Sequence, residues 1–179
     1  MPNWCHNSAT FICPTKEIYD VLLESINKNT WFQKFAPLGL DETKYDDGYE
    51  YKRAIEVWKT KWVPNEFEVV DKCDDTLTID LSFETAWSPP IGVYSKMYSD
   101  FQIDINAFYE ELGCEYFGRC FFSKDGESDE TFDIPSNEDE LDEIRKIIGS
   151  ELNDFMESTW EYLEERWAEE DEEYNDVEN

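Results

Sequence analysis

The chain has 179 residues and a formal net charge of −29, with 44 acidic side chains against 15 basic ones. A hydrophobic content of 40% and an aromatic content of 16% exclude a disordered acidic polymer, because such chains are poor in aromatic residues. The length favours one domain with an appended element. The negative charge disfavours direct binding to nucleic acid or to an anionic membrane surface.

The sequence shows no sign of a membrane span, a secretory signal or a metal site. No apolar run approaches the roughly 18 residues of a membrane span, and Met1–Trp4 lacks the basic and apolar regions of a secretory signal. The five cysteines are scattered and none has C-x-x-C spacing, which fits reduced thiols in a cytoplasm. With His6 as the single histidine, we expect no metal site, no iron–sulfur cluster and no other cofactor.

The N-terminal part of the chain predicts a strand followed by a helix. Residues 8–13 are rich in β-forming side chains and end at Pro14, which indicates a strand. Thr15 is placed to cap a helix in which apolar side chains between residues 18 and 26 recur at helical spacing.

The next part of the chain is less regular. Residues 41–51 are acidic and polar and are expected to form a loop. Residues 54–62 are apolar and aromatic, and they fit either a strand or an insertion around two tryptophans. Residues 67–70 form a weak strand candidate. Residues 76–84 alternate apolar and polar side chains, which is the pattern of a half-buried strand.

A second helix and two further strands follow. Two prolines precede residues 91–101, which carry apolar side chains on one helical face. Residues 101–110 alternate again, residues 114–123 are aromatic and strand-like, and residues 124–127 form a turn. The order of strand, helix, strands, helix and strands predicts an α+β fold, a two-layer sandwich over residues 1–125.

Residues 126–179 differ from the rest of the chain, because they hold 22 acidic and three basic residues, a net charge of −19. Asn137 begins a helix with acids in its first turn. Gly149 either kinks this helix or links two helices. Beyond it, apolar side chains from Leu152 to Trp167 recur every three or four residues, and the faces between them are almost all acidic. We expect an acidic helical extension packed on or beside the core.

Four segments carry a resemblance to one family: residues 1–7 (MPNWCHN), 58–62 (WKTKW), 83–91 (FETAWSPPI) and 109–118 (YEELGCEYFG). They are similar to the phage and plasmid family with a YubB-type ferredoxin-like domain, and the similarity covers roughly residues 1–125. The resemblance implies a ferredoxin-like βαββαβ core, encoded by a mobile genetic element and working in the cytoplasm of a bacterial host. It implies no cluster ligands and no activity that transfers to particular residues.

Three groups of residues are candidate sites, and each also has a structural interpretation. Cys5 and His6 could form a nucleophile pair, but neighbours on a strand point to opposite faces, which favours a structural role with Trp4 in the core. Trp87 is interpreted as packed beneath a rigid proline corner rather than as a recognition surface. The tryptophans of residues 58–62 flank two lysines and could stack on bases, but the net charge disfavours that role.

The acidic helix gives the strongest functional signal. Residues 150–173 hold 11 acids and one arginine, over a helix length of about 36 Å at roughly 1.5 Å per residue. The charge per unit length is close to that of one DNA strand, which carries one phosphate per roughly 3.4 Å. Ordinary solvated helices mix lysines with glutamates, so a partner-binding face is favoured over a merely solvating one.

Since no catalytic motif is present, we expect a non-enzymatic inhibitor that mimics nucleic acid. It would block the basic channel of a DNA- or RNA-binding host protein, such as a defence nuclease, as an anti-CRISPR or anti-restriction protein does. Two alternatives stay open: a non-inhibitory accessory protein that binds a basic host protein, and a nucleic-acid-binding module that uses the sheet aromatics. The sheet, a second copy of the chain in a homodimer, or the target could cover the apolar stripe. The predicted partner-binding residues are Glu151, Asp154, Glu157, Glu161, Glu164, Glu165, Glu169, Glu170, Asp171, Glu172 and Glu173.

Overall fold

The computed structural model describes residues 3–40 and 49–177, without the side chains of Tyr49 and of residues 171–177. The chain forms two compact units that meet between Phe132 and Asp133. The elements of the first are β1 (Trp4–Ile12), α1 (Lys16–Asn27), α2 (Trp31–Phe35), α3 (Tyr49–Trp58), β2 (Phe67–Cys73), β3 (Thr78–Ala86), α4 (Ile91–Phe101), β4 (Asp104–Glu111), β5 (Tyr116–Ser123) and β6 (Gly126–Asp133). The second contains α5 (Glu138–Ile147), α6 (Ser150–Phe155) and α7 (Glu157–Val177).

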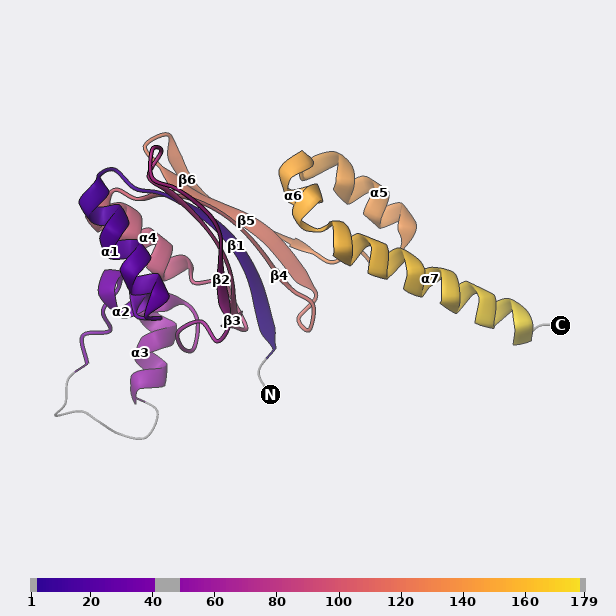
Figure 1. Cartoon of the computed structure of the whole chain (residues 1–179). Coiled ribbons are helices and arrows are strands. Elements are labelled where there is room, and N and C mark those ends of the chain that lie inside the picture. The colour runs from indigo at the N-terminus through magenta and orange to yellow at the C-terminus, as the bar shows by residue number, and fades with distance from the viewer. Residues whose placement is uncertain (1–2, 41–48, 178–179) are drawn as a thin grey trace. The chain divides into compact units, whose positions relative to one another are not determined.

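The first unit is built on a six-stranded antiparallel sheet in the order β2-β3-β1-β4-β5-β6 (Figure 1). β1 lies between β3 and β4 and pairs with both along most of its length. The predicted α+β order of a βαββαβ core is confirmed, with α2 and α3 inserted between α1 and β2. β5 and β6 extend this core on the outer side of β4.

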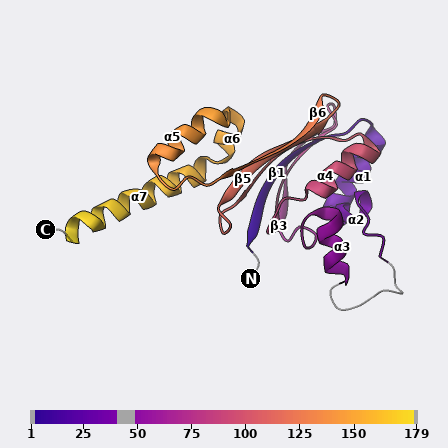
Figure 2. The ribbon, with the colours of Figure 1, turned by 180° about the vertical axis from the view of Figure 1, so that it is seen from behind.

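One face of the sheet is covered by α1 to α4, as Figures 1 and 2 both show. Every second residue of β1 from Cys5 to Phe11 is buried, which is the period of a strand with one covered face. An aromatic cluster fills the space under the helices. The Trp31 ring lies edge-on to the Phe11 and Phe83 rings, with centroids 5.7 and 5.4 Å apart, a favoured aromatic geometry.

Two helices, α1 and α5, begin at the capping residues that the sequence predicts. The Thr15 hydroxyl accepts a hydrogen bond from the Ile18 backbone N–H at the start of α1, and the Asn137 side chain accepts one from Glu140 at the start of α5. Each side chain therefore satisfies one backbone donor that lacks a partner within its helix.

Two parts of the chain differ from the predictions. Residues 54–58 of the segment interpreted as a strand or an insertion instead form the end of helix α3, which buries Ala54 and Trp58 one turn apart, and residues 59–62 follow the helix without strand or helix structure. Its first residues are polar, so the helical period was hidden inside the predicted loop 41–51. Residues 126–133, placed in the helical extension, form the edge strand β6, where the strand's mostly exposed positions carry four acids and no apolar alternation.

The second unit is a set of three helices. Gly149, with a φ of 78°, separates α5 from α6, a backbone angle that glycine adopts without strain. The predicted helical region 137–173 is therefore three helices rather than one kinked helix or two. Buried apolar side chains come from all parts of this unit: Leu141, Ile148, Leu152, Met156, Trp160 and Leu163.

Gly92 allows α3 and α4 to approach closely, because a Cβ at this position would overlap the Val57 carbonyl oxygen of α3. We predict that Gly92→Ala lowers the free energy of unfolding by about 2 kcal/mol, since overpacking costs more than the gain in helix propensity. Urea unfolding measures this change. Ser95→Ala, on the exposed face of the same helix, is the control, and an equal effect of both substitutions would contradict the account.

The Glu140 carboxylate accepts hydrogen bonds from the backbone N–H and the hydroxyl of Ser136, which lower its pKa below the ordinary value of 4.5. A lowered pKa stabilises the fold above the ordinary value, and this contribution is lost as the pH falls through the folded-state pKa. We predict that the difference in unfolding free energy between wild type and Glu140→Gln is largest near pH 7 and shrinks as the pH falls below 4.5. Amide exchange in α5 measures this difference, and Glu143→Gln on the same helix is the control; the same pH dependence for both variants would contradict the account.

Candidate functional site

The predicted acidic residues line α6 and α7. Those described as exposed are Glu151, Asp154, Glu157, Glu161, Glu165, Glu169 and Glu170. Glu164 is half-buried and pairs with Arg145 of α5 at 2.8 Å, and Glu170 lies 3.7 Å from Arg166. The side chains of Asp171, Glu172 and Glu173 lie outside the described residues, although their backbone is helical.

Four of these carboxylates form a line along α7. Glu157, Glu161, Glu165 and Glu169 follow one another at intervals of four residues, which places them on one side of the helix. Like charges at this spacing destabilise a helix by about 0.2–0.5 kcal/mol per pair. The line is therefore unfavourable for folding by itself, and a cationic partner would relieve it.

The N-terminal cysteine and histidine do not form a nucleophile pair. Cys5 is fully buried on the helix-covered face of the sheet, whereas the next residue, His6, points to the other face. Burial raises the pKa of the Cys5 thiol, so the thiol is protonated at neutral pH. The structural role predicted for this segment agrees with this geometry, but Trp4 is half-buried rather than in the core.

Trp58, Trp62 and Trp87 lie in different surroundings, and of these only Trp87 departs from its favoured interpretation. Trp58 is a core residue, and its indole N–H donates to the Ala36 carbonyl oxygen at 2.6 Å. Trp87 is 50% exposed rather than packed beneath the proline corner. The Lys61 ammonium lies over the Trp87 ring at 2.8 Å from its centroid, a cation–π arrangement. Trp62 is 39% exposed and packs edge-on against Trp4.

The backbone is held in an unusual conformation at the corner between β3 and α4 and at the end of α3, which a Ser88 hydrogen bond joins to this corner. Trp87 in the corner and Lys59 after α3 have φ angles of 73° and 68°, a region that residues other than glycine seldom adopt. Each such residue costs on the order of 1–3 kcal/mol. Four other non-glycine residues in the described part of the chain share this conformation, Asn29, Leu77, Gln102 and Glu115, but Lys59 and Trp87 are joined through Ser88.

A chain of hydrogen bonds keeps this corner in place. The buried Asn7 amide donates to the Thr85 hydroxyl at 2.9 Å, and the Thr85 hydroxyl donates to the Ser88 carbonyl oxygen at 2.9 Å. The Ser88 hydroxyl donates to the Lys59 carbonyl oxygen at 2.6 Å. Tyr116 of β5 adds a bond from its phenol to the Trp87 carbonyl oxygen at 2.6 Å. The two strained residues are thus tied to β1, β3 and β5.

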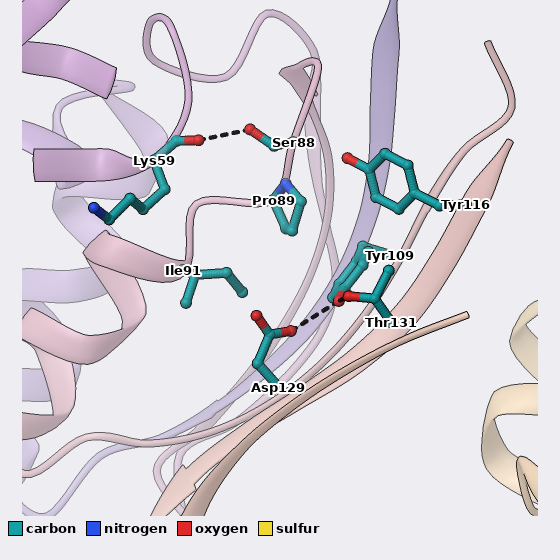
Figure 3. Close-up of a pocket in the computed structure, with 8 residues that line it drawn as sticks. All are labelled: Lys59, Ser88, Pro89, Ile91, Tyr109, Tyr116, Asp129 and Thr131. Carbon is teal, nitrogen blue, oxygen red and sulfur yellow. Dashed lines mark hydrogen bonds between the residues drawn. The ribbon is translucent and has the colours of Figure 1, made fainter. Parts of the chain in front are cut away.

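A pocket of about 490 Å³ adjoins this corner (Figure 3), within the size range of small-molecule sites. It lies where β4, β5 and β6 meet the start of α4. Its lining residues are Lys59, Ser88, Pro89, Ile91, Tyr109, Tyr116, Asp129 and Thr131.

Tyr109 and Asp129 form the polar end of the pocket. The Tyr109 phenol donates to Asp129 Oδ1 at 2.8 Å and lies 2.8 Å from the Thr131 hydroxyl (Figure 3). Burial, with the Asp129 carboxylate nearby, raises the pKa of Tyr109, so the phenol keeps its proton at neutral pH. Gly118 on β5 makes this arrangement possible, because a Cβ there would lie 2.5 Å from the Tyr109 hydroxyl oxygen.

Within residues 3–40 and 49–177, no group of three or more His, Cys, Asp or Glu side chains could hold a metal ion. In the same residues, no helix combines the length and the apolar character needed to cross a bilayer.

The pocket could not be predicted from the amino-acid sequence. Its residues come from five separate segments, and Asp129 and Thr131 lie on β6, which was not predicted as a strand. The two signals that were present are the WSPP corner and Gly118, but neither indicates a cavity without the sheet order.

We predict that Thr85→Val lowers the free energy of unfolding by about 2 kcal/mol, because it leaves the buried Asn7 amide and the Ser88 carbonyl oxygen without this partner. Thr78→Val is the control, since Thr78 lies on the same strand and bonds only within a turn, and it should change the value by less than about 0.5 kcal/mol. Urea unfolding measures both. Equal losses would show that the hydrogen-bond chain does not stabilise the corner.

A family model described as a ferredoxin-like domain in Api92-like protein matches residues 57–151. The crystal structure of protein Api92 from Yersinia pseudotuberculosis is similar over 50% of this chain and 31% of that chain, with 12% sequence identity and a TM-score of 0.40. This chain thus matches about a third of that protein's length. No curated protein matches the sequence.

The family match confirms the ferredoxin-like part of the predicted resemblance, over residues 57–151 rather than 1–125, and a phage or plasmid origin stays a prediction. Because the matched segment covers more than half of the 179 residues, the chain belongs to the family of proteins with the Api92-like ferredoxin-like domain.

Proposed function

We propose that the helical unit α5–α7 binds a basic, nucleic-acid-binding protein by presenting carboxylates where that protein would receive phosphates. The supporting observation is the line of four exposed carboxylates on α7, Glu157, Glu161, Glu165 and Glu169, within residues 150–173, which hold 11 acids and one arginine. Complementary charge speeds the encounter and fixes orientation. The partner's cations would also remove the repulsion within the line.

The partner class follows from this charge. A nuclease or another protein that holds DNA or RNA in a basic channel has the complementary surface. The resemblance of the N-terminal segments to phage and plasmid proteins supports a defence nuclease of a bacterial host as the target, with inhibition as the result. An accessory protein that binds a basic host protein without blocking it would use the same face.

The proposal predicts that the full chain displaces a labelled DNA duplex from the partner. The full chain is immobilised and used to capture proteins from a bacterial lysate, and mass spectrometry identifies the captured proteins. Each captured protein is then purified separately and bound to the labelled duplex. We predict that substituting the four glutamates by glutamine (Glu157→Gln, Glu161→Gln, Glu165→Gln and Glu169→Gln) raises the concentration needed for displacement by about tenfold or more. Removing repulsion along α7 should leave the fold intact.

A matched variant removes four charges from exposed positions of the first unit, through Glu17→Gln, Asp75→Asn, Asp125→Asn and Glu127→Gln. The concentration of this variant needed for displacement should stay within about twofold of the wild-type value, because the charges removed from the first unit do not contact the partner under this proposal. If both variants lose displacement equally, net charge rather than α7 is responsible. If displacement instead depends on Trp62 or Trp87, the sheet aromatics carry the binding and the proposal is wrong.

A further inference from the structure

We infer that the pocket between the β3–α4 corner and strands β4 to β6 binds a small organic cation, an amine with an aromatic or branched apolar body. This site is independent of the acidic helices, because all of its lining residues lie in the first unit. Its volume of about 490 Å³ suits a small molecule.

The walls of the pocket are suited to an apolar body. Pro89 and Ile91 lie on the side of α4, and the rings of Tyr109 and Tyr116 lie on the side of the sheet (Figure 3). The two rings meet edge-on, with centroids 6.2 Å apart. Both phenols already donate within the protein, Tyr109 to Asp129 and Tyr116 to the Trp87 carbonyl oxygen. The Tyr109 ring is only 1% exposed and shapes the wall from within, whereas the half-buried Tyr116 ring can offer a ligand its π face, which attracts cations.

The negative charge of the Asp129 carboxylate favours a cationic ligand in the pocket. Asp129 is the lining carboxylate, and Tyr109 occupies one of its oxygens, while the other faces the space between Ile91 and Tyr109 (Figure 3). Lys59 lines the pocket too, but its ammonium points away from the other lining residues (Figure 3). An amine placed beside Asp129 would form a charge-assisted hydrogen bond, and an anion would be repelled.

The rigidity of the corner supports a built site rather than an incidental gap. Two strained backbone positions, Lys59 and Trp87, border the pocket and are fixed by hydrogen bonds from Ser88 and Tyr116. A preformed wall reduces the entropy lost when a ligand binds. The unbranched side chain of a lysine on another protein would leave much of a 490 Å³ pocket unfilled, which favours a free amine with a larger body.

The test is a titration of the full chain with three probes of similar shape: phenethylamine, phenethyl alcohol and hydrocinnamate. Calorimetry measures affinity, and the amide NMR spectrum locates the site. Phenethylamine should bind about tenfold more tightly than the neutral alcohol, and hydrocinnamate more weakly than either. The largest changes in amide chemical shift should occur at Tyr109, Tyr116 and Asp129. This comparison needs no variant, so it does not depend on a mutant that folds.

The matched variants are Asp129→Asn and Glu127→Gln, which remove one charge each from the same strand. Asp129→Asn keeps an acceptor for the Tyr109 phenol and should weaken phenethylamine by about tenfold. Glu127→Gln should stay within about twofold of wild type. The inference is overturned if the three probes bind alike, if Asp129→Asn and Glu127→Gln have equal effects, if no probe binds, or if a capped lysine derivative binds more tightly than phenethylamine.

Discussion

Mutual repulsion among 44 acidic side chains is the constraint that the rest of this structure must meet. Repulsion of this size opposes a compact state, so the apolar side chains have to offset it. The first unit does so with a dense aromatic core, in which Trp31 contacts Phe11 and Phe83. The second unit buries apolar residues such as Leu152 and Trp160 from its own helices. The carboxylates are left on the outer positions of α7.

The acidic line and the pocket differ in how their positions are fixed. The carboxylates of α7 stand on one helix, are solvated, and act through charge over a distance of several ångströms. The pocket depends on short hydrogen bonds among Asn7, Thr85, Ser88 and Lys59, which join parts of the chain that are far apart in sequence. The affinity of a partner for α7 should therefore fall with added salt, whereas the affinity of a ligand for the pocket should fall when substitutions disturb the hydrogen bonds that shape it.

Sequence alone predicts the features that arise from local patterns. The alternation at residues 76–84, the cap at Thr15 and the cap at Asn137 all correspond to observed elements. It does not predict β6, because an edge strand with exposed faces needs no apolar period. It also misses the exposure of Trp87, since the left-handed backbone there is imposed by Ser88, Tyr116 and other tertiary contacts.

The most direct measurement of the central claim is the salt dependence of the affinity between the full chain and its captured DNA-binding partner, followed by fluorescence anisotropy from about 50 mM to about 200 mM salt. If the carboxylates of α7 replace phosphates, the affinity falls steeply across this range, and the slope becomes shallower when the four α7 glutamates are changed to glutamine. An affinity that does not change with salt, or a slope that is the same for both proteins, would contradict the account.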